Sequence, residues 1–201
     1  ADATGIHQRD IRAERSALDA IELMNVGVNY LREHVPEDTR IHYVVTGGGD
    51  QPNVVPATAS SWFYVRADRH QSVEQTWARI VDIARGAALM TGTTMSHVVD
   101  GDSHEVLPNR ALAHLIDANL QSVGPPRFDD ADRAFARETQ KDLGPAFDRA
   151  LFEDIVPVPA EPGQGMHSTD QGDLSWRVPT GSLDVAAYAF GAPGHSWQVA
   201  A

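Results

Sequence analysis

A glycine- and proline-rich corner at residues 46–57 is the feature that most restricts how this chain can fold. Three glycines and two prolines fall within these twelve residues. Glycine permits backbone angles that are closed to other residues, and proline fixes φ, so the segment predicts a rigid turn. β-branched and aromatic residues flank it at 39–45 and 60–67. The pattern therefore predicts two strands joined by the corner.

Two polar side chains have a defined place on this unit. Asn53 lies on the turn and Arg66 lies near the end of the second strand. A side-chain amide and a planar guanidinium together are suited to holding a carboxylate. A turn asparagine and a solvated strand arginine are the simpler interpretation. The pattern by itself leaves both interpretations open.

Two helices and further strands complete the first hundred residues. A helix is expected from a Ser16 cap up to Pro36, because apolar residues recur at helical spacing between them. A second helix is expected between a Ser72 cap and Gly92, and 93–99 is expected to form a strand. With a first strand in the lead-in, the order becomes βαββαβ. That order gives two helices on one face of a four-stranded antiparallel sheet.

The second half of the chain has mainly helical patterns. A domain boundary is expected at 101–108, after which helices are predicted at 110–123, 129–143 and 146–155. The whole chain is therefore expected to be of the α+β or α/β class. In the lead-in, His7 is expected to be a solvated histidine.

The composition excludes several classes of protein and site. The chain has 28 acidic and 16 basic residues, so nucleic acid and anionic membranes would be repelled. No apolar run approaches the ~20 residues of a membrane span, and no export signal opens the chain. A cytoplasmic location is therefore expected. Cysteine is absent, so any metal must be held by His, Asp or Glu.

Several motifs resemble one enzyme family. The run GGGDQPNVVPATA, with Arg66 thirteen positions after Asn53, resembles the lid-domain signature of the dinuclear-zinc amidohydrolases and carboxypeptidases. Segments 15–34, 168–176 and 191–198 are most similar to the aminobenzoyl-glutamate hydrolase branch of that family. The resemblance implies a ferredoxin-like lid, or dimerisation, domain followed by a partial, helix-rich piece of the α/β catalytic domain. The divisions expected from it are 1–15 (lead-in), 16–101 (lid) and 102–201 (distal catalytic segment).

The resemblance also implies a chemistry. In this family zinc, or another divalent metal such as manganese, supports hydrolysis of the amide between an acyl group and an amino acid. By this match Asn53 and Arg66 hold the α-carboxylate of the substrate and His195 is a metal ligand. Asp170 and Asp173 would orient the metal ligands. An alternative is that these two residues are ordinary turn and cap acids.

Most of the family's metal ligands are missing from the sequence. It contains no His-x-Asp motif and no adjacent pair of glutamates. We therefore expect part of an N-acyl amino acid amidohydrolase that is inactive alone and binds no metal stably. It would form a homodimer through the lid and be completed by a separate N-terminal catalytic polypeptide. The alternative is a non-catalytic dimerisation or carboxylate-binding module, or a truncated gene product, of the same superfamily.

Overall fold

The chain folds into two compact units. The computed structural model describes residues 4–9, 15–144, 147–161, 163 and 169–200, with the backbone alone for 4–9. One unit is Ala1–Leu107 with Gln164–Arg177, and the other is Pro108–Gly163 with Val178–Ala201. The expected division differs from these units, because residues 164–177 group with the first unit instead of with the rest of 102–201.

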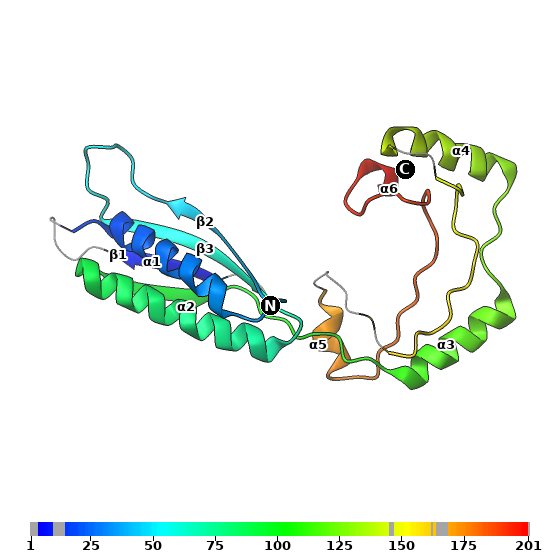
Figure 1. The fold of residues 1–201 in the computed structure, drawn as a ribbon, viewed down its shortest axis with the longest axis horizontal. Coiled ribbons are helices and arrows are strands. Elements are labelled where there is room, and N and C mark those ends of the chain that lie inside the picture. Colours follow the sequence, from blue (N-terminus) through cyan, green and yellow to red (C-terminus); the bar gives the residue numbers. More distant parts are fainter. Residues whose placement is uncertain (1–3, 10–14, 145–146, 162, 164–168, 201) are drawn as a thin grey trace. The chain divides into compact units, whose positions relative to one another are not determined.

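The first unit has two layers, an antiparallel sheet and a pair of helices packed on it. Its antiparallel sheet has the order β2-β3-β1-β4 (Figure 1). The strands are β1 (Thr4–Arg9), β2 (Arg40–Gly47), β3 (Thr58–Arg66) and β4 (Thr94–Val99). The predicted βαββαβ element order is confirmed, with the lead-in supplying β1 between β3 and β4. His7 lies in β1, and its side chain is outside the described residues.

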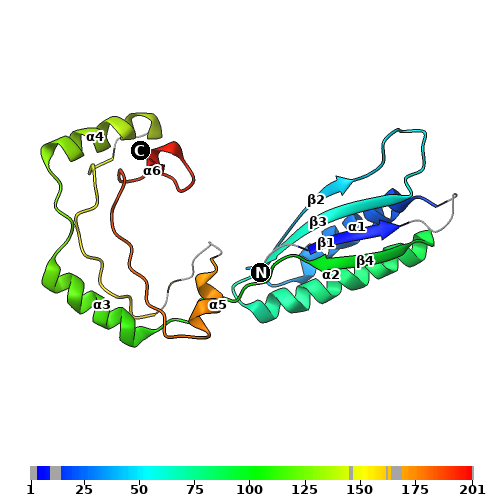
Figure 2. The same ribbon diagram turned by 180° about the vertical axis from the view of Figure 1, so that it is seen from behind.

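Two helices cover one face of this sheet (Figures 1 and 2). They are α1 (Ala17–Leu31), continued by η1 (Arg32–His34), and α2 (His70–Thr91). Side chains of β3 alternate between buried and exposed, so one face of the strand packs on the helices. The core between the layers includes Met24, Val28, Leu31, Ile41, Phe63, Val65, Val73, Ile80, Ala84 and Ala87.

The N-terminus of α1 is capped by a residue close in sequence, whereas that of α2 is capped by a distant one. Ser16 caps α1 as predicted, because its hydroxyl accepts from the backbone N–H of Asp19 at 3.2 Å. The predicted Ser72 cap of α2 is wrong, since α2 begins at His70. The Glu105 carboxylate accepts from the His70 backbone N–H at 2.9 Å. A residue distant in sequence thus satisfies the helix end that a local hydroxyl was expected to cap.

The second unit has helices where two of the three predictions placed them. Its elements are α3 (Arg110–Val123), α4 (Asp130–Gln140), η2 (Lys141–Leu143) and α6 (Trp197–Ala200). In the described parts of the chain, no helix combines the length and apolar character of a membrane span.

The helix predicted at 146–155 is wrong for its described part, 147–155. The Gln140 amide donates to the carbonyl of Arg149 at 2.8 Å, and Arg137 donates to the carbonyl of Phe147 at 2.8 Å. These side chains occupy carbonyls that a helix would have used internally. Tertiary hydrogen bonds therefore replaced the local helical pattern.

Phe63 tests the assignment of the buried face of β3. Its side chain is fully buried, and its ring lies 5.2 Å from that of Tyr43. Because truncation removes apolar contacts and leaves a cavity, Phe63→Ala should lower the free energy of unfolding by about 3–5 kcal/mol. The matched control Val98→Ala, at a 56% exposed position on β4, should change it by no more than about 0.5 kcal/mol. Urea denaturation measures both, and equal losses would contradict the assigned faces.

Candidate functional site

The face of the sheet away from the helices carries a row of aromatic and cationic side chains. We call this surface the open face. On β3 it presents Trp62, Tyr64 and Arg66, as the alternation predicted. Trp62 and Tyr64 contact edge to face, with ring centroids 5.1 Å apart. Their partners on β2 are Val44, His42 and Arg40, in that order.

The Arg66 guanidinium has no partner among the described residues. It is exposed, and among the described residues nothing forms a hydrogen bond or ion pair with it. A guanidinium offers five N–H donors in a fork that matches a carboxylate. Arg66 is therefore available to an anion from outside the first unit.

Asn53 lies at the other end of the strand. It is exposed in a turn closed by the N–H of Val54, which donates to the carbonyl of Gln51 at 3.1 Å. The loop lies at the end of the sheet opposite to that where β3 leads into α2 (Figure 1). β3 has nine residues, and at about 3.3 Å per residue its ends are roughly 26 Å apart. The structure therefore does not bring Asn53 and Arg66 together in one chain, and the predicted clamp is not formed there.

The corner itself is closely packed. Gly49 has a φ of 106°, a conformation that favours glycine. A Cβ at this position would lie 2.8 Å from the Pro56 ring, so no side chain fits. Only glycine therefore fits at this point of the loop that carries Asn53.

His195 has an unusual backbone conformation in the second unit. Its φ of 62° is positive, which is uncommon outside glycine and often marks a functional position. The side chain is exposed in the described structure. The turn is stabilised by the Ser196 hydroxyl, which donates to the carbonyl of Pro193 at 2.7 Å.

The described residues do not fit a dinuclear metal centre. Within them, no group of three or more His, Asp or Glu side chains could hold a metal ion. His195 belongs to the second unit, whereas Asp170 and Asp173 belong to the first. One imidazole cannot supply the coordination that a metal of this kind needs. Further ligands would have to come from outside the described residues.

Asp173 contacts a histidine. It lies in α5 (Gln171–Ser175), and its carboxylate accepts from the His104 ring at 2.7 Å and from the His104 N–H at 3.0 Å. The Trp176 indole donates to the carbonyl of Glu105 at 2.8 Å. A Cβ on Gly172 would lie 1.8 Å from the His104 carbonyl oxygen, so only glycine permits this approach. Asp170 precedes α5 without a side-chain capping bond.

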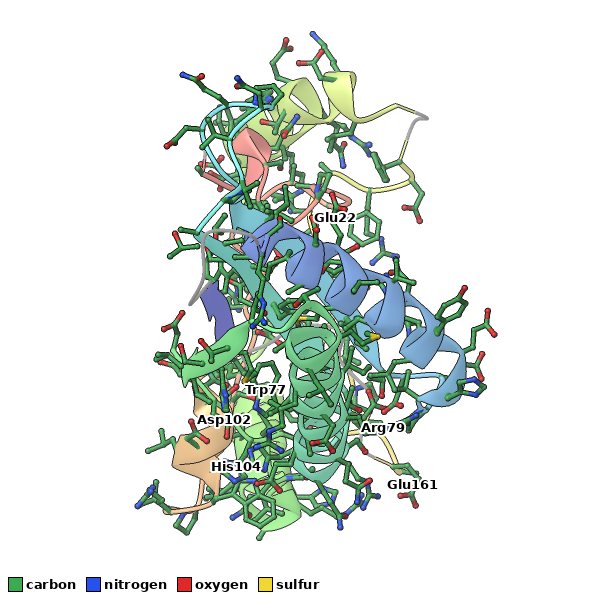
Figure 3. The ribbon with its side chains drawn as sticks, turned by 90° about the vertical axis from the view of Figure 1, so that its left-hand side faces the viewer. Glu22, Trp77, Arg79, Asp102, His104 and Glu161 are labelled. Atoms are coloured by element: carbon green, nitrogen blue, oxygen red, sulfur yellow. The ribbon has the colours of Figure 1, made fainter. Side chains whose placement is uncertain are left out.

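These contacts extend to the start of α2. The rings of His70 and His104 stack with centroids 4.1 Å apart, and His70 Nε2 lies 2.7 Å from Asp102 Oδ2. Figure 3 shows Asp102 and His104 on one side of α2. We call His70, Asp102, His104, Glu105 and Asp173 the histidine clasp. Sequence reasoning missed it, because its members come from three separate segments and no local motif links them.

Two carboxylates of the clasp are held in the ionised form. The His104 ring and then the His104 backbone N–H lower the pKa of Asp173. Burial opposes ionisation of Glu105, but the backbone N–H groups of His70 and Glu105 and the two imidazoles hold the pKa of Glu105 below its ordinary value. The clasp is therefore expected to depend on pH in acid.

Comparison with known proteins identifies the first unit. Residues 4–90 match the M20_dimer family, the peptidase dimerisation domain. The chain is 35% identical over 210 residues to a subunit of the p-aminobenzoyl-glutamate hydrolase of Escherichia coli, covering 92% of this chain and 44% of that protein. It is also 29% identical over 112 residues to the Xaa-Arg dipeptidase of Mus musculus, covering 54% of this chain and 26% of that protein. The chain therefore spans less than half the length of these relatives.

A solved structure supports the same fold. The aminobenzoyl-glutamate utilization protein from Klebsiella pneumoniae superposes with a TM-score of 0.52 at 18% identity, covering 61% of this chain and 33% of that one. Residues 4–90 therefore match a peptidase dimerisation domain, and the chain is similar to a subunit of an amidohydrolase, in agreement with its motifs.

The histidine clasp should loosen in acid. Because the pKa values of Asp173 and Glu105 are lowered on folding, their stabilisation is fully present above their ordinary values of 3.8 and 4.5. It is lost as pH falls through the lowered values. Trp176 fluorescence should report this release during an acid titration.

Asp173→Asn should release part of the clasp already at neutral pH. The neutral amide oxygen accepts a weaker hydrogen bond from the His104 ring than the charged carboxylate does. Asp50→Asn, at an exposed loop carboxylate, is the matched control and should leave the titration unchanged. An Asp173→Asn protein with the wild-type titration curve would contradict the role of the clasp.

Proposed function

We propose that this chain is the lid and distal part of a metal-dependent amidohydrolase that cleaves N-acyl amino acids of the aminobenzoyl-glutamate type. The uncommitted Arg66 guanidinium on the open face of a peptidase dimerisation domain carries this proposal. The substrate class follows the name of the Escherichia coli relative, a subunit of p-aminobenzoyl-glutamate hydrolase. A cytoplasmic location stays an expectation from the sequence.

The role of this chain is to bind and position the substrate. The described residues form no metal centre, so no bond-breaking step is assigned to them. We propose that His195 contributes one ligand to a zinc or manganese site whose other ligands lie on a separate N-terminal polypeptide. Hydrolysis is therefore expected only when both parts are present.

A homodimer through the β2 edge would explain the separation of Asn53 and Arg66. β2 is an edge strand with exposed Val44 and Val45, and such edges pair readily with another strand. The other edge, β4, lies outside the family match at residues 4–90. The exposed apolar residues of α1 that would accompany this interface are Leu23, Val26 and Tyr30.

Antiparallel pairing of two β2 edges places opposite ends of the sheets side by side. Gly47 of one copy would then lie near Arg40 of the other, and Arg40 pairs with Arg66 in register. The loop with Asn53 follows β2, so it would reach the Arg66 end of the second copy. We propose that the carboxylate site combines Arg66 of one copy with Asn53 of the other.

Arg66→Ala should raise KM for p-aminobenzoyl-glutamate by about 10- to 100-fold in the reconstituted enzyme, because one or two charge-assisted hydrogen bonds are lost. The metal content should not change. Steady-state kinetics and metal analysis measure the two effects. The matched control Arg85→Ala removes an exposed arginine that pairs with Asp82 at 2.9 Å, and it should leave KM unaltered. An unchanged KM in Arg66→Ala would rule out the carboxylate role.

Mixing two impaired variants tests whether the site is shared between copies. Asn53→Ala and Arg66→Ala chains, refolded together in equal amounts and assayed in the reconstituted enzyme at substrate concentrations below KM, should recover about a quarter of wild-type activity. In a two-fold dimer half of the mixed population is heterodimer, and each heterodimer has one intact site of two. No recovery, with heterodimer shown by mass spectrometry, would mean that both residues act within one copy or not at all.

A non-catalytic module is the second candidate, because Arg66 could bind a carboxylate without any metal centre. It predicts binding of N-acyl amino acids by this chain and no hydrolysis on mixing with a catalytic polypeptide. A truncated gene product of the same superfamily would also give no hydrolysis. Hydrolysis on mixing would exclude both.

A further inference from the structure

Two arginines stand directly opposite each other on the open face. Arg40 on β2 pairs with Arg66 on β3, and both are exposed. Directly opposed residues of an antiparallel pair have Cβ atoms about 5 Å apart, and like charges there are destabilising. The chain has 28 acidic residues and only 16 basic ones. The pairing of two arginines is therefore not a consequence of an excess of basic residues.

Neither arginine is neutralised by the protein in the described structure. Arg40 Nη1 donates to the carbonyl of Thr39 at 2.9 Å and to that of Glu37, both of which are backbone groups. The neighbouring carboxylate of Asp38 accepts from the backbone N–H of Asp68 at 3.0 Å. Two arginines paired across neighbouring strands thus lack an anionic partner in the described structure, and a ligand with two negative charges would supply one.

We propose that Arg40 binds the second carboxylate of the substrate and selects N-acyl derivatives of dicarboxylic amino acids. This inference rests on the proposed function, in which Arg66 holds the α-carboxylate. The two carboxyl carbons of glutamate are four bonds apart, a span of about 5 Å at about 1.5 Å per bond with tetrahedral angles. That span is comparable with the spacing of about 5 Å between the Cβ atoms from which two opposed side chains start.

The charge of the chain favours a small dianion over a larger polyanion. The formal net charge is −12, so an extended phosphate backbone would be repelled across the rest of the surface. A single amino acid derivative needs only the local pair of cations. Arg40 is therefore assigned to substrate specificity, and the selected group is the side-chain carboxylate.

Calorimetric titration of the full chain tests the assignment with two ligands. The first is p-aminobenzoyl-glutamate, and the second is p-aminobenzoyl-glutamine, which has nearly the same shape and lacks the side-chain charge. The wild-type chain should prefer the glutamate ligand by about tenfold or more. Arg40→Gln should abolish this preference and leave the affinity for the glutamine ligand unchanged. Arg66→Gln should weaken the binding of both ligands.

Two further variants separate charge from structure. Arg79→Gln is the matched control, because Arg79 is an exposed arginine that also donates to a backbone carbonyl, that of His34 at 2.7 Å (Figure 3). It should keep the wild-type preference. Arg40→Lys keeps the charge and should retain most of the preference. A complete loss in Arg40→Lys as well as in Arg40→Gln would show a structural effect and overturn the assignment.

The outcomes distinguish this inference from the proposed function. If Arg40→Gln keeps the preference for glutamate, the specificity role of Arg40 is overturned and the carboxylate role of Arg66 stands. If the wild-type chain binds both ligands equally, the same conclusion follows. If the wild-type chain binds neither ligand, the proposed function and this inference are both overturned.

Discussion

The register between β2 and β3 is the constraint on which the rest of the first unit depends. It places Phe63 and Val65 in the core and leaves Tyr64 and Arg66 on the open face. A slip of one residue would exchange the two faces, exposing the core and burying a guanidinium. The corner that joins the two strands leaves no room for a side chain at Gly49, and the ladder shifts between Val45 and Gly47.

The histidine clasp performs a comparable task at the other end of the sheet. It joins the start of α2, the segment after β4 and α5 through charged hydrogen bonds and a stacked ring pair. Glu105 accepts from the first backbone N–H of α2. One carboxylate therefore caps the N-terminus of the helix and also holds the segment that leaves the sheet. Asp173, for which a role near a metal is predicted, contacts His104 in this cluster.

Local signals made much of the fold predictable. Ser16 and Asp129 cap α1 and α4 by hydrogen bonds within four residues, and Gly92 adopts the left-handed conformation expected at the end of α2. The predictions failed where distant groups competed for backbone atoms, as at Ser72. The sequence proposed the residue types of the candidate site but could not give their arrangement, because the length of β3 separates Asn53 from Arg66.

The sequence by itself determined the element order and the resemblance to a lid motif that contains Asn53 and Arg66, since periodicity, caps and a spaced motif are all local properties. Only the tertiary structure decided which residues face one another. Arg40 has no motif of its own, and its position opposite Arg66 depends on the antiparallel register. The clasp likewise exists only because folding brings His70, His104 and Asp173 together. Contacts between residues far apart in the chain depend on how its elements pack, which no local pattern records.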